Sequence, residues 1–201
     1  MMERNRNNSK MREENPDAKA LFIEGLKELG KDPDPSKVTL RFASRGTTEL
    51  SKKMAEWMKQ TWEETLGITI EIDMMEWNIM WDRVDAGDYD IATAGWGPYY
   101  NEPSAIFGLF EPENGYFNAD KTGWNDEDSK KFSELLASVE NVTDPQEKAQ
   151  IYLQLEEILV GGGIICPTYL LESPSFVSDK VEGYYVSTNG MTDFTQVSVT
   201  K

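Results

Sequence analysis

The sequence predicts an α/β fold built on a mostly parallel sheet flanked by helices. Three strand-like runs, residues 38–43, 68–74 and 89–94, alternate with two helical segments, residues 49–66 and 77–86. Connections long enough to hold a helix indicate parallel strands, because a tight turn joins only antiparallel ones. With 201 residues, 39% of them hydrophobic, the chain is long enough to bury a core.

The beginning of the chain predicts one helix before the first strand. Residues 1–15 are polar and are expected to form a flexible amino-terminal segment. Asn15 is expected to cap the helix, Pro16 to open it and Gly30 to close it. The first strand, residues 38–43, follows a turn that contains two prolines.

The next part of the chain predicts a helix and then a strand, which differ in the spacing of their apolar residues. Apolar residues recur at helical spacing over residues 49–66, so Trp57 and Trp62 are expected to face the core, and Gly67 ends this helix. Residues 68–74 alternate with period two, which is typical of a half-buried strand.

Three further helices are predicted after the third strand. The first is short and lies near residues 103–110, and Asn125 is expected to cap the second, which runs to about residue 140. Asp144 opens the third helix with a capping box in which Pro145 takes the first helical position.

The end of the chain predicts strands. Residues 164–171 form an apolar run typical of a buried strand, so Cys166 within it is expected to be a buried, inert thiol. The predicted domains are the flexible segment 1–15, an α/β ligand-binding lobe 16–173 and a carboxyl-terminal segment 174–201 with short strand-like pieces.

Composition excludes several classes of function. The formal net charge of −16 opposes binding to nucleic acid and to anionic membrane surfaces, which depends on clustered Lys and Arg. The chain has no histidine, which excludes Ser-His-Asp and Cys-His catalysis and removes the commonest zinc ligand. Because no apolar run approaches 18 residues and no glycine-rich phosphate motif is present, we expect no membrane insertion, no cofactor and no metal.

The ligand site is expected at the carboxyl edge of the sheet, where open parallel sheets bind their ligands. Three loops leave the predicted strands there, at residues 44–48, 75–77 and 95–102. The side chains expected to meet at this rim are Arg45, Thr47, Trp77, Trp96, Tyr99 and Tyr100.

Each of these residues also has a purely structural interpretation. Residues 44–48 fit an ordinary helix-start loop, and Trp77 and Trp81, one helical turn apart, fit packing of a helix on the sheet equally well. Trp96 directly follows a buried strand and fits a cap of the core. Tyr99 and the tyrosine after it lie between a proline and an asparagine, where a surface or ligand role is favoured.

From about residue 16 onward, ordered motifs resemble the carboxyl-terminal lobe of the oligopeptide-binding proteins of ABC importers, the peptide/nickel solute-binding family. The motifs that carry this resemblance are Lys52-Lys53-Met54-Ala55, Gly67-Ile68-Thr69-Ile70-Glu71-Ile72, Glu76-Trp77, Gly87-Asp88-Tyr89-Asp90-Ile91, Ala94-Gly95-Trp96-Gly97-Pro98, Asn101-Glu102-Pro103-Ser104, Glu156-Glu157-Ile158-Leu159, Cys166-Pro167-Thr168-Tyr169 and Val181-Glu182-Gly183-Tyr184.

The resemblance implies a periplasmic-binding-protein-like (type II) lobe, one half of a clamshell. Such bacterial transport proteins are not enzymes: they capture oligopeptides and deliver them to the permease subunits of an ABC transporter. They are exported to the periplasm or held on the cell surface as lipoproteins. A signal segment and the first lobe are expected to lie outside this chain, with residues 174–201 returning toward the missing lobe.

One position departs from the motif. Peptide-binding relatives commonly read Gly-Trp-x-x-Asp-Tyr, and this aspartate pairs with the α-amino group of the peptide. Tyr99 stands there, and a neutral phenol binds an ammonium less strongly than a carboxylate does. Glu76 or Glu102, which follows Asn101 in the same loop, is a candidate substitute. Some relatives also carry an arginine for the peptide's carboxylate at the position of Thr93.

Other functions stay open on the sequence. The aromatic loop Trp96-x-x-Tyr99-Tyr100 would suit stacking on a sugar, so the solute could be an oligosaccharide or another non-peptide. An acidic hydrolase would need two carboxylates that face one pocket, one of them with a raised pKa. An interaction module that binds a protein partner is a third alternative.

Overall fold

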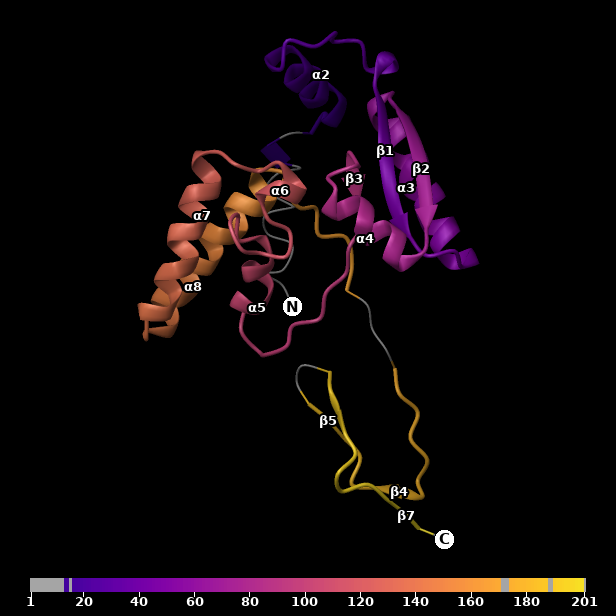
Figure 1. Cartoon of the computed structure of the whole chain (residues 1–201), viewed down its shortest axis with the longest axis vertical. Coiled ribbons are helices and arrows are strands. Elements are labelled where there is room, and N and C mark those ends of the chain that lie inside the picture. The colour runs from indigo at the N-terminus through magenta and orange to yellow at the C-terminus, as the bar shows by residue number, and fades with distance from the viewer. Residues whose placement is uncertain (1–12, 15, 171–173, 188–189, 201) are drawn as a thin grey trace. The chain divides into compact units, whose positions relative to one another are not determined.

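The computed structural model describes residues 13–14, 16–170, 174–187 and 190–200 (Figure 1). Contacts between residues divide the chain into two units. The first unit holds residues 1–95 and 117–126, and the second holds residues 96–116 and 127–201. The predicted flexible segment 1–15 falls outside the described residues except at Glu13 and Glu14. The domain boundaries predicted at 15/16 and 173/174 stay predictions.

A three-stranded parallel sheet forms the centre of the first unit, in the order β2-β1-β3 (Figure 1). Its strands are β1 (Thr39–Arg45), β2 (Thr69–Met75) and β3 (Ile91–Ala92). Strand β1 pairs with β2 along its whole length, from Thr39 opposite Thr69 to Arg45 opposite Met75. Strand β3 is shorter than the predicted run 89–94, because the chain enters a loop rich in glycine and proline soon after it. The predicted parallel α/β sheet is confirmed.

Helices α3 (Glu49–Leu66) and α4 (Trp77–Asp85) follow β1 and β2 as predicted. Helix α2 (Ala18–Glu28) and the 3-10 turn η1 (Pro35–Lys37) precede β1, and the short helix α6 (Ala119–Thr122) was not predicted. Helix α3 ends at Gly67, whose φ of 78° is readily adopted only by glycine. Asp17 caps α2, because its carboxylate accepts a hydrogen bond from the Ala20 N–H at 2.9 Å. The predicted cap, Asn15, lies outside the described residues.

The two faces of the sheet are covered by different helices. Helix α3 packs on the face of Phe42 and Ile70, and the Trp62 ring meets Phe42 edge-on at 5.0 Å. Helix α4 covers the opposite face, where Ala43, Met75 and Met80 are buried. The predicted core role of Trp62 is confirmed. The prediction for Trp57 is wrong: this side chain is 64% exposed, because the buried stripe of α3 runs one residue to its side, through Met58.

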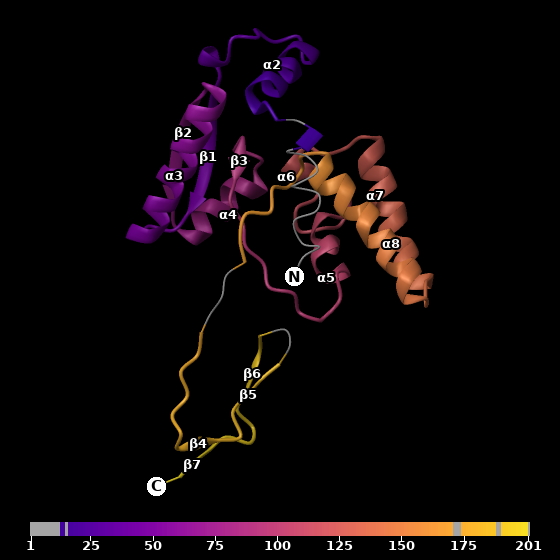
Figure 2. The ribbon, with the colours of Figure 1, turned by 180° about the vertical axis from the view of Figure 1, so that it is seen from behind.

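The second unit is built on packed helices followed by short strand pairs (Figure 2). Its elements are α5 (Ser104–Phe107), η2 (Gly108–Phe110), α7 (Glu127–Ser138), η3 (Val139–Asn141), α8 (Pro145–Glu156), the π-helical turn η4 (Glu157–Gly161), β4 (Val181–Glu182), β5 (Tyr185–Val186), β6 (Thr192–Asp193) and β7 (Ser198–Val199). Strands β4 and β7 pair antiparallel, as do β5 and β6. Phe132 of α7 and Leu155 of α8 are fully buried.

The helix starts of the second unit follow the predicted chemistry closely. The Asp144 carboxylate accepts hydrogen bonds from the N–H groups of Gln146 and Glu147, so the predicted cap of α8 is confirmed. Helix α7 begins at Glu127, so the residue before it is Asp126 and not the predicted Asn125.

The predicted buried strand at 164–171 is wrong over its described part. Residues 165–170 form neither helix nor strand, Tyr169 and Leu170 are 63% and 70% exposed, and Cys166 is an exposed free thiol instead of a buried one. An apolar run becomes a strand only when another strand pairs with it, and the described strands of this unit pair with one another. Within the described ranges, no helix combines the length and apolar composition needed to cross a membrane.

Candidate ligand-binding site

The carboxyl edge of the sheet in the first unit carries four of the predicted site residues. Arg45 is the last residue of β1, Thr93 follows β3 directly, and Trp77 opens the helix after β2. Hydrogen bonds tie these strand ends together: the Arg45 N–H donates to the side-chain Oγ1 of Thr93 at 3.5 Å, and the Gly46 N–H donates to the Met75 carbonyl at 3.1 Å. We call this edge the rim.

The side chains of the rim place a cation, a carboxylate and an aromatic ring close together. Arg45 Cζ lies over the Trp77 ring, 4.3 Å from its centroid. The Thr47 hydroxyl donates to Glu76 Oε1 at 3.1 Å. The rim therefore offers groups that can bind both charges and flat or apolar surfaces.

The sequence left two roles open for Trp77 and Trp81, which are packing on the sheet and a place at the ligand site. The structure distinguishes the two residues. Trp81 is partly buried, packs against the cluster of Ala43 and Met75, and meets the Phe117 ring at 5.6 Å. Trp77 touches Trp81 edge-on at 5.2 Å but is 43% exposed and supports Arg45. Packing on the sheet accounts for Trp81, whereas Trp77 keeps a surface open to solvent.

The other five predicted residues belong to the loop of the second unit. Trp96 is half-buried and meets the rings of Tyr99 at 5.9 Å and Tyr116 at 5.0 Å. Its indole Nε1 is buried and has no hydrogen-bond partner among the described residues. Tyr99 and Tyr100 are 72% and 51% exposed, which agrees with the surface position predicted for them.

Two open pockets lie beside this loop within the second unit. One, of about 200 Å³, is lined by Pro98, Tyr100, Asn101, Glu102, Pro103 and Ile106. The other, of about 400 Å³, is lined by Tyr100, Glu102, Ser104, Gly108, Leu136, Val139, Glu140 and Lys148. The structure thus groups Tyr100, Asn101 and Glu102 together, and it groups Arg45, Thr47, Trp77 and Thr93 on the rim. The meeting of these two groups in one site stays a prediction.

Glu102 is held by two residues of helix α8. Its Oε1 accepts hydrogen bonds from Lys148 Nζ at 3.0 Å and from the Tyr152 hydroxyl at 2.8 Å. The Lys148 ammonium, followed by the Tyr152 hydroxyl, holds the pKa of the Glu102 carboxyl below its usual value. Neither partner was predicted from the sequence, although their spacing of four residues on one helix face indicates that they can share a contact.

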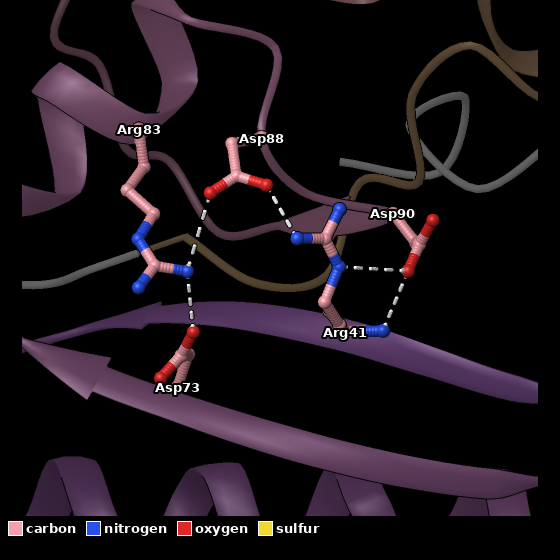
Figure 3. A network of polar contacts seen from close by, with 5 residues as sticks. All are labelled: Arg41, Asp73, Arg83, Asp88 and Asp90. Atoms are coloured by element: carbon pink, nitrogen blue, oxygen red, sulfur yellow. Dashed lines mark hydrogen bonds and ion pairs between the residues drawn. The ribbon is translucent and has the colours of Figure 1, made fainter.

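A second group missed by the sequence analysis is a charged network in the middle of the sheet (Figure 3). The Arg41 guanidinium pairs with Asp88, and the Arg41 N–H donates to Asp90 Oδ2 at 2.7 Å. Arg83 bridges Asp73 at 2.6 Å and Asp88 at 3.5 Å. The hydrogen bond from Arg41 holds the pKa of Asp88 below its ordinary value. This network ties β1, β2 and α4 to the turn before β3.

Comparison with known proteins identifies the family. Residues 4–118, more than half of the chain, match the family of bacterial extracellular solute-binding proteins, family 5. The chain belongs to this family. This chain is 29% identical over 175 residues to the oligopeptide-binding protein OppA of Bacillus subtilis (strain 168). The match covers 86% of this chain and 31% of that protein. The chain spans less than a third of the length of this relative and of the dipeptide-binding protein DppE of Bacillus subtilis (strain 168).

Solved structures agree with this assignment. A substrate-binding domain of an oligopeptide ABC transporter from Bacillus anthracis str. Ames superposes with a TM-score of 0.70 at 23% identity, over 92% of this family 5 chain and 34% of that one. The OppA of Haemophilus influenzae in complex with RPPGFSPFR superposes with a TM-score of 0.56 at 28% identity, over 68% and 26% of the respective chains. The predicted periplasmic-binding-protein-like fold and family are confirmed.

Proposed function

We propose that this chain is one lobe of the substrate-binding component of an ABC importer, and that it captures oligopeptides for delivery to the permease. The observation that carries the proposal is the rim, where Arg45, Glu76 and the exposed face of Trp77 lie together. A peptide presents two charged ends and flat amide groups, and these match the rim's groups. The relatives named as oligopeptide-binding proteins support this choice of solute.

The proposed setting follows from the family. Family 5 members are extracellular solute-binding proteins. We propose that the longer protein that holds this lobe works outside the cytoplasm, either in the periplasm or anchored by lipid to the cell surface.

Glu76 is the proposed acceptor for the α-amino group of the peptide. Tyr99 supplies a phenol hydroxyl instead of a carboxylate at the position where peptide-binding relatives commonly have an aspartate. Glu102 is already bound by the Lys148 ammonium, so its charge is largely matched within the protein. Glu76 accepts a hydrogen bond from the neutral Thr47 hydroxyl and forms no ion pair with any described residue, so its charge is available to a ligand.

Binding is tested with the 201-residue chain by following the tryptophan indole signals in NMR titrations. The probes are trialanine, N-acetyl-trialanine and maltotriose, because a single lobe should bind weakly and NMR detects millimolar affinities. We expect trialanine to shift the Trp77 indole signal and maltotriose to leave it unchanged. No shift with any probe would exclude solute binding, and a shift with maltotriose alone would favour an oligosaccharide.

Two variants separate the candidate acids. Glu76→Gln should weaken trialanine binding and leave N-acetyl-trialanine binding unchanged, whereas Glu102→Gln should affect both equally or neither. Glu71→Gln is the matched control, since this exposed residue of β2 undergoes the same change of charge. A loss of preference for the free amine in Glu102→Gln would make Glu102 the acceptor instead.

The hydrolase alternative needs a carboxyl group with a raised pKa as its general acid. The shifts found at Asp32, Asp34, Glu63, Asp88, Glu102 and Asp193 all lower the pKa, which disfavours these six as that acid.

A further inference from the structure

Hydrogen bonds hold the backbone at Arg45 in place. This residue ends the central strand of the sheet, and hydrogen bonds join its own N–H to Thr93 and the next N–H, of Gly46, to Met75. The guanidinium lies over the Trp77 ring. Stacking on an aromatic face leaves the N–H donors at the edge of the guanidinium plane available for hydrogen bonds.

The guanidinium of Arg45 is unusual in having no acidic partner among the described residues. The chain has 36 Asp and Glu against 20 Lys and Arg, so an exposed arginine has many carboxylates to pair with. Arg41 and Arg83 in the same unit are both paired with aspartates. In the described part of the chain, Arg45 forms neither an ion pair nor a side-chain hydrogen bond, and Glu76 beside it bonds to Thr47 instead.

We propose that Arg45 binds a carboxylate of the ligand, with Trp77 as the surface that orients the guanidinium. This inference rests on the proposed function, and it assigns the terminal carboxylate of the peptide to the rim of the first unit. The planar fork of an arginine matches a carboxylate with two parallel hydrogen bonds. Because Trp77 already restricts the guanidinium, less side-chain freedom is lost when the carboxylate binds.

The test compares two ligands that differ only at the carboxyl end. N-acetyl-trialanine and its carboxyl-terminal amide both lack the free α-amino group, so neither offers Glu76 an ammonium group to bind. We expect the 201-residue chain to bind the acid about fivefold more tightly than the amide, as measured by NMR titration of the indole signals. Arg45→Gln should bind both forms with the affinity of the amide.

Two further variants keep the result specific. Arg45→Lys should retain part of the preference, because it keeps the charge but loses the fork. Lys53→Gln, which removes one positive charge from an exposed position on α3, should retain the whole preference. A circular dichroism spectrum confirms that each variant is folded.

The outcomes separate this inference from the proposed function. Equal affinity of the unmodified chain for acid and amide would overturn the role of Arg45 and leave peptide binding standing. An undiminished preference in Arg45→Gln would do the same. No binding of either form, or of trialanine, would overturn both proposals.

Discussion

Arg41 and Arg45 stand four residues apart on one strand and on the same face of the sheet, yet their surroundings differ. Arg41 lies in the middle of β1 and is paired with Asp88 and Asp90 (Figure 3). Arg45 lies at the carboxyl end of β1 over an indole ring and has no carboxylate partner among the described residues. The comparison teaches that position along the strand decides the use of a charge. In the middle the charge joins elements of the fold, and at the end it is the charge that we propose binds the ligand.

The largest expected effect concerns the buried core beneath the strand that carries both arginines. Phe42 follows Arg41, is fully buried and packs against Trp62. Phe42→Ala should lower the free energy of unfolding by about 3–5 kcal/mol, because it removes buried surface and leaves a cavity. Urea unfolding followed by circular dichroism measures this loss. Leu50→Ala, at a side chain that is 70% exposed, should change it by less than about 0.5 kcal/mol.

The next prediction separates the two arginines by stability. Arg41→Gln should lower the free energy of unfolding, because it leaves Asp90 without its guanidinium partner and Asp88 with Arg83 alone. The loss should be smaller than that of Phe42→Ala, since the network is partly exposed to solvent. Arg45→Gln should cost at most about 1 kcal/mol, because it removes only the exposed cation–π contact with Trp77. Equal losses from the two substitutions in urea unfolding would remove the distinction.

The charged network also predicts a pH dependence. The pKa of Asp88 in the folded chain is lowered by the hydrogen bond from Arg41. Stabilisation by this group is therefore complete above the unfolded pKa of about 3.9 and is lost as the pH falls through the lower folded value. The free energy of unfolding, measured in urea at a series of pH values from 6 downward, should decrease below about pH 4. Arg41→Gln should flatten this decrease, and an unchanged slope would show that other carboxylates cause it.

The smallest expected effect sharpens the role of the rim. Trp77→Ala should reduce the preference for N-acetyl-trialanine over its amide by about two- to fivefold, as exposed cation–π contacts contribute only about 0.5–1 kcal/mol. The titration follows the remaining indole signals. Trp57→Ala is the matched control, because this tryptophan of α3 is also exposed and lies away from Arg45 in sequence and contact. The same loss in both variants would contradict the specific role of Trp77.

Local patterns predicted the elements of the fold well. Helix α3 begins and ends at the predicted residues, because its capping threonine, apolar periodicity and terminal glycine all act within the segment itself. Burial was less predictable. Trp57 and Cys166 were expected inside and are exposed, since burial depends on which other elements cover a residue.

The site shows the same division between local and long-range information. The order of parallel strands alone placed Arg45, Thr47 and Trp77 on one rim. The partners of Glu102 lie 46 and 50 residues away on α8, and the network of Arg41 spans 47 residues to Asp88. Such contacts follow from tertiary packing, and no local spacing shows which distant residue a helix face will meet.

The exposed thiol of Cys166 provides a site for specific labelling. It belongs to the chain's single cysteine, so a maleimide dye would react at one site and give a uniformly labelled preparation. None of the rim or network residues would be altered by this attachment. The labelled chain could then be immobilised or followed by fluorescence anisotropy while ligands are added, without any engineered tag near β1.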